Sequence, residues 1–377
     1  MRLFISCSEL GLGHVSRIIP LGKLLSERGH ELIFFSGGVA YQLLSREFEN
    51  VHPCTPVAWY ESSFGVIASA SVLNILFPLP RYNYENDRLE IKSSNTAETI
   101  HRYYDLRRHV LRIKPEMVIA DGDMHALRLA HRWRIPSVYI TNVIRPSYRF
   151  SSLLIPGERF TERYVKRCNR IIVPDNPKNT LCEYSIGDID HIGIRKKIEF
   201  VGSFYNMTSE RGFENHIFAS ISGPLGTRAK LARMIIPILL RLKTRSIVSL
   251  GDPNNKAVRK HGNCEIYSWL SREQRDYYMK NAEIVIFSGG HGTCFEVIKY
   301  GKPSICIPTQ PEQMGNARKM QELKCSISVE KETQLKPAIL EIEEKRELYK
   351  KNVGEMREYC RKFKGVKNAV QEIEKIL

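Results

Sequence analysis

The chain has 377 residues, of which 42% are hydrophobic and 26% are charged, values close to the average for a folded soluble protein. This length suits two domains of about 150–200 residues each, and the composition excludes a disordered tail, a fibrous repeat and a polytopic membrane protein. The 57 Lys and Arg residues outnumber the 41 Asp and Glu residues, and the resulting net charge of +16 favours an anionic partner such as nucleic acid, lipid headgroups or a phosphorylated small molecule.

Short apolar runs alternate with helical patterns over the first two hundred residues. The patterns predict strands at Leu3–Cys7, Glu31–Phe35, Met117–Ala120, Ser137–Thr141 and Arg170–Pro174, and helices at Val15–Arg28 and Met124–Trp133. This β-α-β-α order predicts a parallel sheet with helices on both faces.

The same order restarts after about residue 200. The patterns predict strands at His216–Ile221, Ser246–Leu250, Glu265–Tyr267, Glu283–Phe287 and Pro303–Ile307, and helices at Gly226–Leu242 and from a glycine-rich stretch to Tyr300. The predicted fold class is therefore α/β, with two Rossmann-like, doubly wound domains in tandem. We expect an N-terminal domain over 1–200, a C-terminal domain over 201–350 and a linker at Ile198–Tyr205. From Lys331 the chain becomes charged and helical, without further strand signals.

The sequence lacks the patterns of a secreted or membrane-spanning protein, which predicts a cytoplasmic location. The nine cysteines are spread singly without CxxC spacing, which is typical of reduced thiols in a cytoplasm. The apolar start of the chain stops at glycines and lacks the pattern of a signal peptide. The longest uncharged stretch is Phe64–Pro80, which is short for a membrane span. We interpret it either as a buried helix or loop, or as an apolar element facing a membrane or an acceptor.

Two motifs follow predicted strands of the N-terminal half. Gly11-Leu12-Gly13-His14 lies between the first strand and the first helix, where glycines let the backbone approach a ligand. His14 either caps this loop or acts as a general base. Asp121-Gly122-Asp123 ends another strand at the same sheet edge. Its carboxylates could bind magnesium, Asp121 could orient His14, or Asp121 could only cap the following helix.

The C-terminal half carries the strongest motif. The buried strand at Glu283–Phe287 leads into Ser288-Gly289-Gly290-His291-Gly292-Thr293 and a helix, and a helix N-terminus after a glycine-rich turn suits a diphosphate. Glu296 lies one turn into that helix, where its carboxylate can accept from two ribose hydroxyls. Glu312 and Gln313 follow the next strand and suit sugar hydroxyls, and Ser222-Gly223-Pro224 forms another loop at this crevice.

These motifs together resemble a known family. The segment SGGHGTCFEVIKYGKPSICIPTQPEQMGNA is similar to the donor-binding signature of GT-B fold glycosyltransferases that use nucleotide sugars. The likeness is greatest to family-28-like members, which include N-acetylglucosaminyltransferases acting on the lipid-linked precursor of peptidoglycan. The N-terminal GxGH followed by a helix also fits them, whereas about 41–116 does not. The resemblance implies a cleft between the domains and a C-terminal helix at 351–377 that packs back on the N-terminal domain.

The resemblance also implies roles for individual residues. His14 would be the acceptor base with Asp121 as its partner, beside a loop containing Gly11 and Gly13. Many relatives have a His directly before the glycine pair, where this chain has Ser288 and carries His291 instead. The implied donor site comprises the diphosphate loop Ser288, Gly289, Gly290, His291, Gly292 and Thr293, the ribose acceptor Glu296, the sugar readers Glu312 and Gln313, the phosphate-side residues Ser222 and Gly223, and the uracil-side residues Ser268, Trp269 and Leu270. The fold implies no catalytic metal and no cofactor.

The implied activity is the inverting, metal-independent transfer of a hexose or N-acetylhexosamine from a UDP-sugar. The acceptor would be a hydroxyl of a lipid-linked or other membrane-associated molecule in the synthesis of a cell-surface glycan or glycolipid. The uncharged Phe64–Pro80 is followed by a basic run, which suits a peripheral enzyme on the inner face of an anionic membrane, unless these cations form a solvated helix face. The run consists of Arg81, Arg88, Lys92, Arg102, Arg107, Arg108, Arg112 and Lys114.

Two other functions remain open on the same fold, a UDP-sugar 2-epimerase and a non-catalytic nucleotide-sugar-binding subunit. The expected partners are a UDP-sugar, a lipid-linked or glycan acceptor and an anionic membrane surface. Nucleic acid is not expected, because the basic residues are dispersed and no nucleic-acid-binding motif is present.

Overall fold

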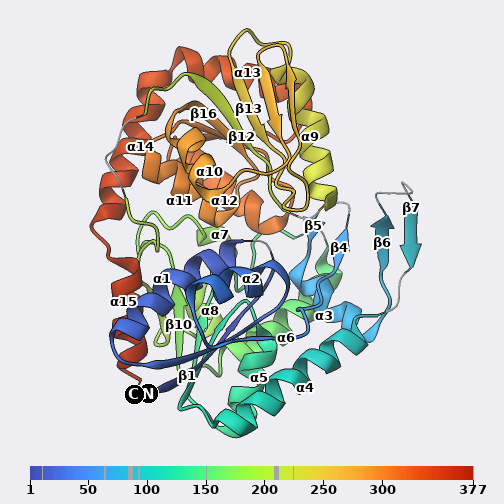
Figure 1. Cartoon of the computed structure of the whole chain (residues 1–377), viewed down its shortest axis with the longest axis vertical. Helices are drawn as coiled ribbons and strands as arrows, with labels where there is room; N and C mark the ends of the chain where they lie inside the picture. The colour runs from blue at the N-terminus through green and yellow to red at the C-terminus, as the bar shows by residue number, and fades with distance from the viewer. Residues whose placement is uncertain are drawn as a thin grey trace.

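The computed structural model describes residues 1–10, 12–62, 65–83, 88–91, 94–149, 151–207, 212–223 and 225–376. The chain forms two lobes, each built around a seven-stranded sheet, with the N-terminal lobe below and the C-terminal lobe above (Figure 1). The prediction of an α/β protein with two Rossmann-like domains is confirmed. Among the described residues, every helix is too short or too polar to cross a membrane.

The sheet of the first lobe is entirely parallel and has the order β11-β10-β9-β8-β1-β2-β3. Its central strands are apolar and buried, as expected when helices cover both faces. β1 pairs with β8 so that Cys7 lies beside Asp121, and this register brings the loops after both strands to one edge. The strands are β1 (Arg2–Cys7), β2 (Glu31–Ser36), β3 (Val51–Pro53), β8 (Met117–Asp121), β9 (Ser137–Ile140), β10 (Arg170–Val173) and β11 (Ile198–Phe200).

Helices cover both faces of this sheet. Two antiparallel hairpins, β4 (Glu61–Ser62) with β5 (Gly65–Val66) and β6 (Pro80–Asn83) with β7 (Arg88–Ile91), extend from its side. The helices are α1 (Gly13–Glu27), α2 (Gly38–Glu47), α3 (Ala68–Leu76), α4 (Thr96–Ile113), α5 (Met124–Trp133), the 3₁₀ turn η1 (Ser152–Leu154), α6 (Ile155–Val165), α7 (Glu183–Ile186) and α8 (Ile189–Ile192).

The second lobe repeats the plan with the order β14-β15-β13-β12-β16-β17-β18, in which only the pair β14–β15 is antiparallel. Its strands are β12 (His216–Ser220), β13 (Ser246–Ser249), β14 (Val258–His261), β15 (Cys264–Tyr267), β16 (Ala282–Phe287), β17 (Ser304–Cys306) and β18 (Ser326–Ser328). Its helices are α9 (Leu225–Leu239), α10 (Arg272–Lys280), α11 (His291–Tyr300), α12 (Pro311–Glu322), α13 (Glu332–Glu344) and α14 (Arg346–Arg361).

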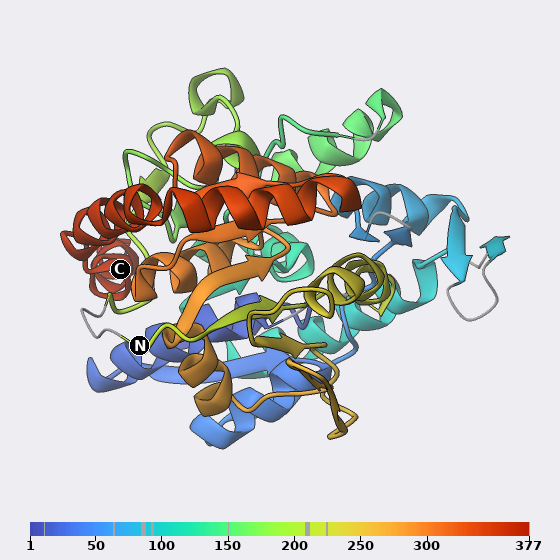
Figure 2. The ribbon, with the colours of Figure 1, turned by 90° about the horizontal axis from the view of Figure 1, so that it is seen from above.

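The end of the chain returns to the first lobe. α14 stays with the second lobe, where Val353, Met356 and Cys360 enter its core. Only α15 (Gly365–Glu374) packs against α1 and joins the first core, which places the two termini close together in Figure 1. Figure 2, seen from above, shows the red C-terminal helices running across the molecule. The predicted return helix at 351–377 is therefore divided between the two lobes.

Three sequence predictions differ from the structure. Ile198–Phe200 is not part of a linker but forms edge strand β11, which pairs with β10. A strand of three residues is too short to show an alternating pattern in the sequence. The strand predicted at Pro303–Ile307 is β17, but it is not the last strand of the sheet. β18 follows it in the chain and pairs with it. Of Phe64–Pro80, Phe64 lies outside the described residues, and the rest is mixed: Ile67 and Ala70 are buried, whereas Phe77 is exposed.

Candidate active site

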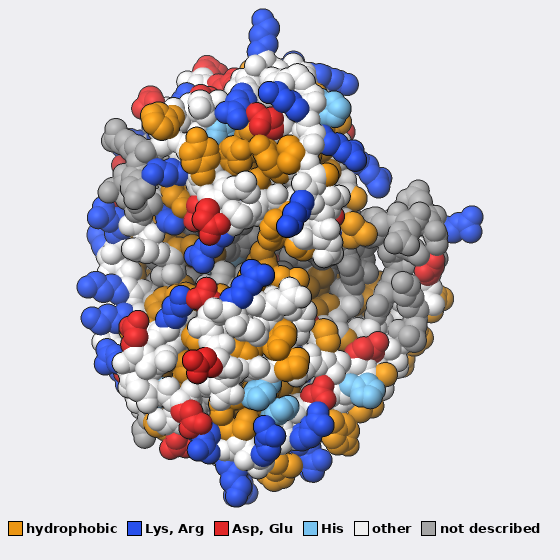
Figure 3. Space-filling model, viewed as in Figure 1, with side chains coloured by type: hydrophobic (Ala, Val, Ile, Leu, Met, Phe, Trp, Pro, Cys, Tyr) orange, Lys and Arg blue, Asp and Glu red, His pale blue; other side chains and the backbone are white. Residues whose placement is uncertain are grey.

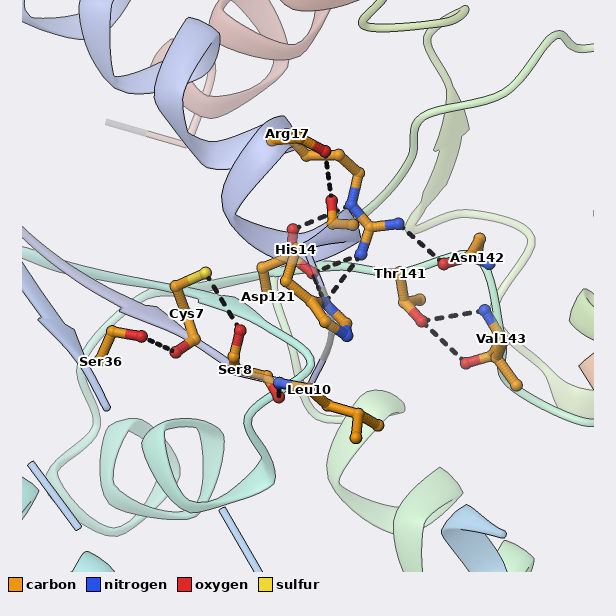
Figure 4. A network of polar contacts seen from close by, with 12 residues as sticks. Cys7, Ser8, Leu10, His14, Arg17, Ser36, Asp121, Thr141, Asn142 and Val143 are labelled. Atoms are coloured by element: carbon orange, nitrogen blue, oxygen red, sulfur yellow. Dashed lines mark hydrogen bonds and ion pairs between the residues drawn. The ribbon is translucent and has the colours of Figure 1, made fainter. Parts of the chain in front are cut away.

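His14 and Asp121 meet at the C-terminal edge of the first sheet. Asp121 ends β8 and is fully buried, and His14 begins the first turn of α1. The His14 Nδ1 atom lies 2.6 Å from Asp121 Oδ1 (Figure 4). The ionised Asp121 carboxylate can only accept, so we assign the proton to Nδ1 and the lone pair to Nε2; Arg17 Nη2 also lies 3.0 Å from Nδ1. Among the described residues none hydrogen-bonds Nε2, which leaves this atom available as a base.

Two neighbours fix this pair. Gly122 has a φ of +69°, and a Cβ atom there would lie 2.5 Å from His14 Cε1, so the glycine between the two aspartates makes room for the ring. Arg17 lies one helical turn after His14 and contacts both Asp121 oxygens, through Nη2 at 2.6 Å and Nε at 3.1 Å. Although burial raises it, the charge of Arg17 and then His14 hold the pKa of Asp121 below its usual range.

Asp123 serves the fold rather than the cleft. Its carboxylate accepts from the His125 N–H, which caps α5, and from the Arg102 guanidinium, with Nη2 at 2.7 Å. Both side chains are fully buried, so Arg102 does not belong to a basic surface as predicted. The two carboxylates of Asp121-Gly122-Asp123 are each paired with an arginine. The absence of a catalytic metal stays a prediction.

The glycine loop after β16 lies at the edge of the second sheet, as predicted. Gly289 has a φ of +80°, and its carbonyl accepts from Asn316 Nδ2 at 3.0 Å. α11 begins at His291, and in the described chain no acceptor is found for the first-turn N–H groups of residues 291–293. A Cβ atom on Gly290 would meet no atom within 4 Å. The loop thus presents free donors and open space, as an anion site requires.

The His291 side chain contacts the other lobe. Its Nε2 atom lies 2.9 Å from Oδ2 of Asp175, which follows β10 in the other lobe, and both are buried. Among the described residues, Asp175, Cys182 and His291 form the single cluster with metal-ligand chemistry, within 4.8 Å of one another. Asp175 also accepts from the Cys182 N–H, and burial raises the pKa of the Cys182 thiol well above its usual range, which disfavours a thiolate ligand. The cluster is a hydrogen-bonded joint between the lobes.

Glu296 faces a cation within its own lobe. Arg275 from α10 binds its carboxylate with two contacts of 2.6 Å, and a third contact of 3.3 Å reaches Ser220 Oγ at the end of β12. Each carboxylate oxygen keeps one lone pair beyond this fork. Ribose hydroxyls can therefore reach Glu296 only beside Arg275.

Glu312 and Gln313 begin α12 but face different partners. Glu312 Oε1 accepts from Asn142 Nδ2 of the first lobe at 2.7 Å, and no described residue binds Oε2. Gln313 Oε1 accepts from the N–H and hydroxyl of Thr309, at 3.0 and 2.9 Å. Glu312 thus keeps one carboxylate oxygen without a described partner at the domain interface. The side-chain carbonyl of Gln313 instead binds Thr309 in the loop before α12.

The remaining predicted residues lie around this centre. Gly13 opens α1, and no atom lies within 4 Å of where its Cβ would be, while Gly11 lies outside the described residues. Ser222 and Gly223 follow β12, the neighbour of β16. Trp269 is half-buried after β15, three places from β16 in the sheet order. The space-filling view shows the surface hollowed between the lobes (Figure 3).

Arg275 and four other residues of this centre were missed by sequence reasoning. Arg17 could have been found from its one-turn spacing to His14, and Asn142 and Asp175 from their positions just after β9 and β10. Tyr205 gave no signal, because the segment between the domains read as linker. Its hydroxyl would lie 2.8 Å from a Cβ atom on Gly292.

Comparison with known proteins finds similar glycosyltransferases. Residues 248–373 match the model of the glycosyltransferase family 28 C-terminal domain. An uncharacterized glycosyltransferase of Methanosarcina mazei is 24% identical over 85% of this chain and 83% of its own length. The UDP-N-acetylglucosamine–N-acetylmuramyl-(pentapeptide) pyrophosphoryl-undecaprenol N-acetylglucosamine transferase of Clostridium tetani is 22% identical over 96% of this chain and 95% of its own.

Solved structures show the same fold at low sequence identity. The glycosyltransferase of kitacinnamycin superposes with a TM-score of 0.69 at 15% identity, covering 100% of this chain and 99% of that chain. A spinosyn rhamnosyltransferase complexed with thymidine diphosphate gives a TM-score of 0.67 at 13% identity, covering 99% of this chain and all of its own.

Proposed function

Since the chain is a glycosyltransferase of the GT-B fold with a family 28 C-terminal domain, we propose that it transfers a hexose or N-acetylhexosamine from a UDP-sugar to a hydroxyl of a lipid-linked acceptor, with inversion. The observation that carries the proposal is the buried Asp121 carboxylate 2.6 Å from His14 Nδ1. It provides a base with a free Nε2 atom, across the domain interface from a helix N-terminus with free donors.

The chemistry follows from these two parts. His14 Nε2 takes the proton of the acceptor hydroxyl as its oxygen forms a bond to the anomeric carbon. The bond from that carbon to the phosphate oxygen breaks, and UDP leaves. The N–H groups at the start of α11 donate to the diphosphate oxygens and stabilise their growing negative charge. Attack from the face opposite the leaving group inverts the anomeric carbon.

The assignment of the donor as a UDP-sugar is supported by the C. tetani relative, whose name includes a UDP-sugar. Glu296 lies one turn into α11 after the diphosphate loop, and Glu312 offers a sugar hydroxyl the oxygen that no described residue binds. The spinosyn rhamnosyltransferase complex contains thymidine diphosphate instead, so the test must compare both nucleotides.

A lipid-linked acceptor is supported by the surface beside the cleft. α3, η1 and α6 pack together and expose Leu76 (73%), Phe77 (61%) and Leu153 (82%). Large apolar side chains that are grouped on a surface, rather than scattered singly, are typical of contact with a partner or a membrane. Arg88 and Arg108 add exposed cations nearby in the chain, while Arg81 and Lys92 have no described side chain. This combination suits the headgroup region of an anionic membrane.

Calorimetric titration with UDP, TDP, GDP and ADP, first in EDTA and then with magnesium, tests the donor. Binding of UDP in preference to the others and without metal supports the proposal, whereas preference for another nucleotide redirects it. UDP-sugars are then incubated with and without polyprenyl-linked acceptors. Inverted product that appears only with acceptor is expected, and a free epimerised sugar without acceptor would indicate an epimerase instead.

Membrane contact is tested by sedimentation with vesicles of phosphatidylglycerol and of phosphatidylcholine. We expect binding to the anionic vesicles, which falls in the double variant Leu76→Ser, Phe77→Ser while UDP affinity is kept. The matched control is Leu348→Ser on α14, an exposed leucine of the other lobe. Equal binding by all three proteins would contradict the role of the apolar surface.

A further inference from the structure

We propose that Arg17 and Asn142 are positioning residues that couple Glu312, on the donor side of the cleft, to the His14–Asp121 pair. The environment of the base then depends on what Glu312 binds. This inference deepens the proposed function and rests on it for the identity of the ligand at Glu312. The coupling itself is a property of the chain alone.

The first link is Arg17. Its side chain is 9% exposed, and its Nη2 atom donates to the same Asp121 oxygen that accepts from His14 Nδ1. One oxygen therefore holds the base and the guanidinium together. In a site from which water is largely excluded, such shared contacts are strong and act on one another. A shift of Arg17 must move the carboxylate that orients the ring.

The second link is Asn142, whose amide can take only one orientation. Its Oδ1 atom accepts from Arg17 Nη1 at 2.8 Å, and its Nδ2 atom donates to Glu312 Oε1 at 2.7 Å. A flipped amide would place two donors together at Arg17 and two acceptors together at Glu312. Both sides specify the same orientation, so Asn142 transmits a change at Glu312 to Arg17.

The third link is Glu312 itself. Its Oε1 atom also lies 3.5 Å from Asn316 Nδ2, and Asn316 holds the carbonyl of Gly289 in the diphosphate loop. With Oε2 free among the described residues, a sugar hydroxyl has one place to donate. That contact would change the charge distribution and the orientation of the Glu312 carboxylate, to which Asn142 Nδ2 donates. The contacts form one continuous path from the glycine loop to His14 (Figure 4 shows its acceptor side).

The test uses the full chain without ligand, labelled with ¹⁵N-histidine. The imidazole nitrogen signals of His14, assigned by their loss in His14→Asn, report its tautomer and hydrogen bonding. We expect Glu312→Gln to shift these signals in the wild-type background but not in Asn142→Ala. The control is Arg170→Gln, which removes an arginine between two carboxylates, Glu199 and Glu372, at the opposite end of the sheet; it should leave the signals and their response unchanged.

Equal shifts in both backgrounds would overturn the coupling, as would no shift from Glu312→Gln in the wild type. Because this cycle needs no donor, its result is separate from whether UDP-sugars bind. With transfer established, Asn142→Ala should lower kcat by about 2- to 30-fold and leave UDP affinity unchanged. Arg17→Lys, which keeps the charge but loses the fork, should lower kcat with the protein still folded.

Discussion

Replacing Gly290 by alanine tests whether the open space at the start of α11 holds the donor diphosphate. Gly290 has φ −61° and ψ 136°, a conformation that alanine adopts freely, and its Cβ atom would meet no atom within 4 Å. Because alanine is a poorer N-cap residue than glycine, the exchange should cost about 0.5–1 kcal/mol of stability. In the ligand complex, however, the new methyl group would stand where the phosphates approach.

Displacing one charge-assisted hydrogen bond costs about 1.5–3 kcal/mol, so the Kd for UDP should rise about 10- to 150-fold in Gly290→Ala by calorimetry. The matched variant is Gly292→Ala, two residues away, whose Cβ would lie 2.8 Å from the Tyr205 hydroxyl. That ring stacks on Phe295 and has little freedom to move, so overpacking should destabilise the protein by about 1–3 kcal/mol. Wild-type UDP affinity in Gly290→Ala would refute the phosphate assignment.

Three further predictions address the base, the buried ion pair and the last helix. His14→Ala should abolish sugar transfer in a product assay while calorimetry gives an unchanged Kd for UDP; lost binding would contradict a purely catalytic role. Although burial raises it, the Arg102 guanidinium brings the pKa of Asp123 down to about 2. Because this lies below the unfolded value of about 3.9, its stabilisation is complete above about pH 4 and is lost as the pH falls toward 2; urea unfolding of Asp123→Asn should show a flatter acid dependence. Gly365→Ala would bring a Cβ within 2.2 Å of the Ser203 carbonyl and should destabilise by about 1–3 kcal/mol, whereas Gly354→Ala, with no atom within 4 Å, should raise stability by about 0.4–1 kcal/mol; equal thermal shifts would contradict this difference.

The local parts of the fold and site could be read from sequence because their signals are local. Helix α5 was predicted with the bounds it has, because its apolar residues recur at helical spacing; its N-cap is Asp123, so the alternative in which Asp121 caps this helix was wrong. The meeting of His14 and Asp121 could be expected because parallel strands bring their carboxyl ends to one edge. This inference requires only that the two strands belong to the same parallel sheet.

Contacts between the lobes could not be predicted in this way. The pairing of His291 with Asp175 depends on how two separately built sheets face one another, which no periodicity encodes. Arg102 was taken for a surface cation because it lies among basic residues, yet its partner is fixed by the packing of α4 on α5. Likewise, the spacing of Glu296 from the glycine loop predicts a ribose contact. The sequence does not indicate that the fold places Arg275 against the Glu296 carboxylate.

The return of α15 to the first lobe has a consequence for how the protein is made. Ala369, Val370 and Ile373 complete the core that begins with Leu3 and Ile5. The N-terminal domain, although synthesised first, therefore lacks part of its interior until α15 has left the ribosome. Domains usually fold in the order of synthesis, but here the second domain can finish first. A released chain truncated before residue 365 should keep a folded C-terminal sheet, while its N-terminal domain stays open to proteases.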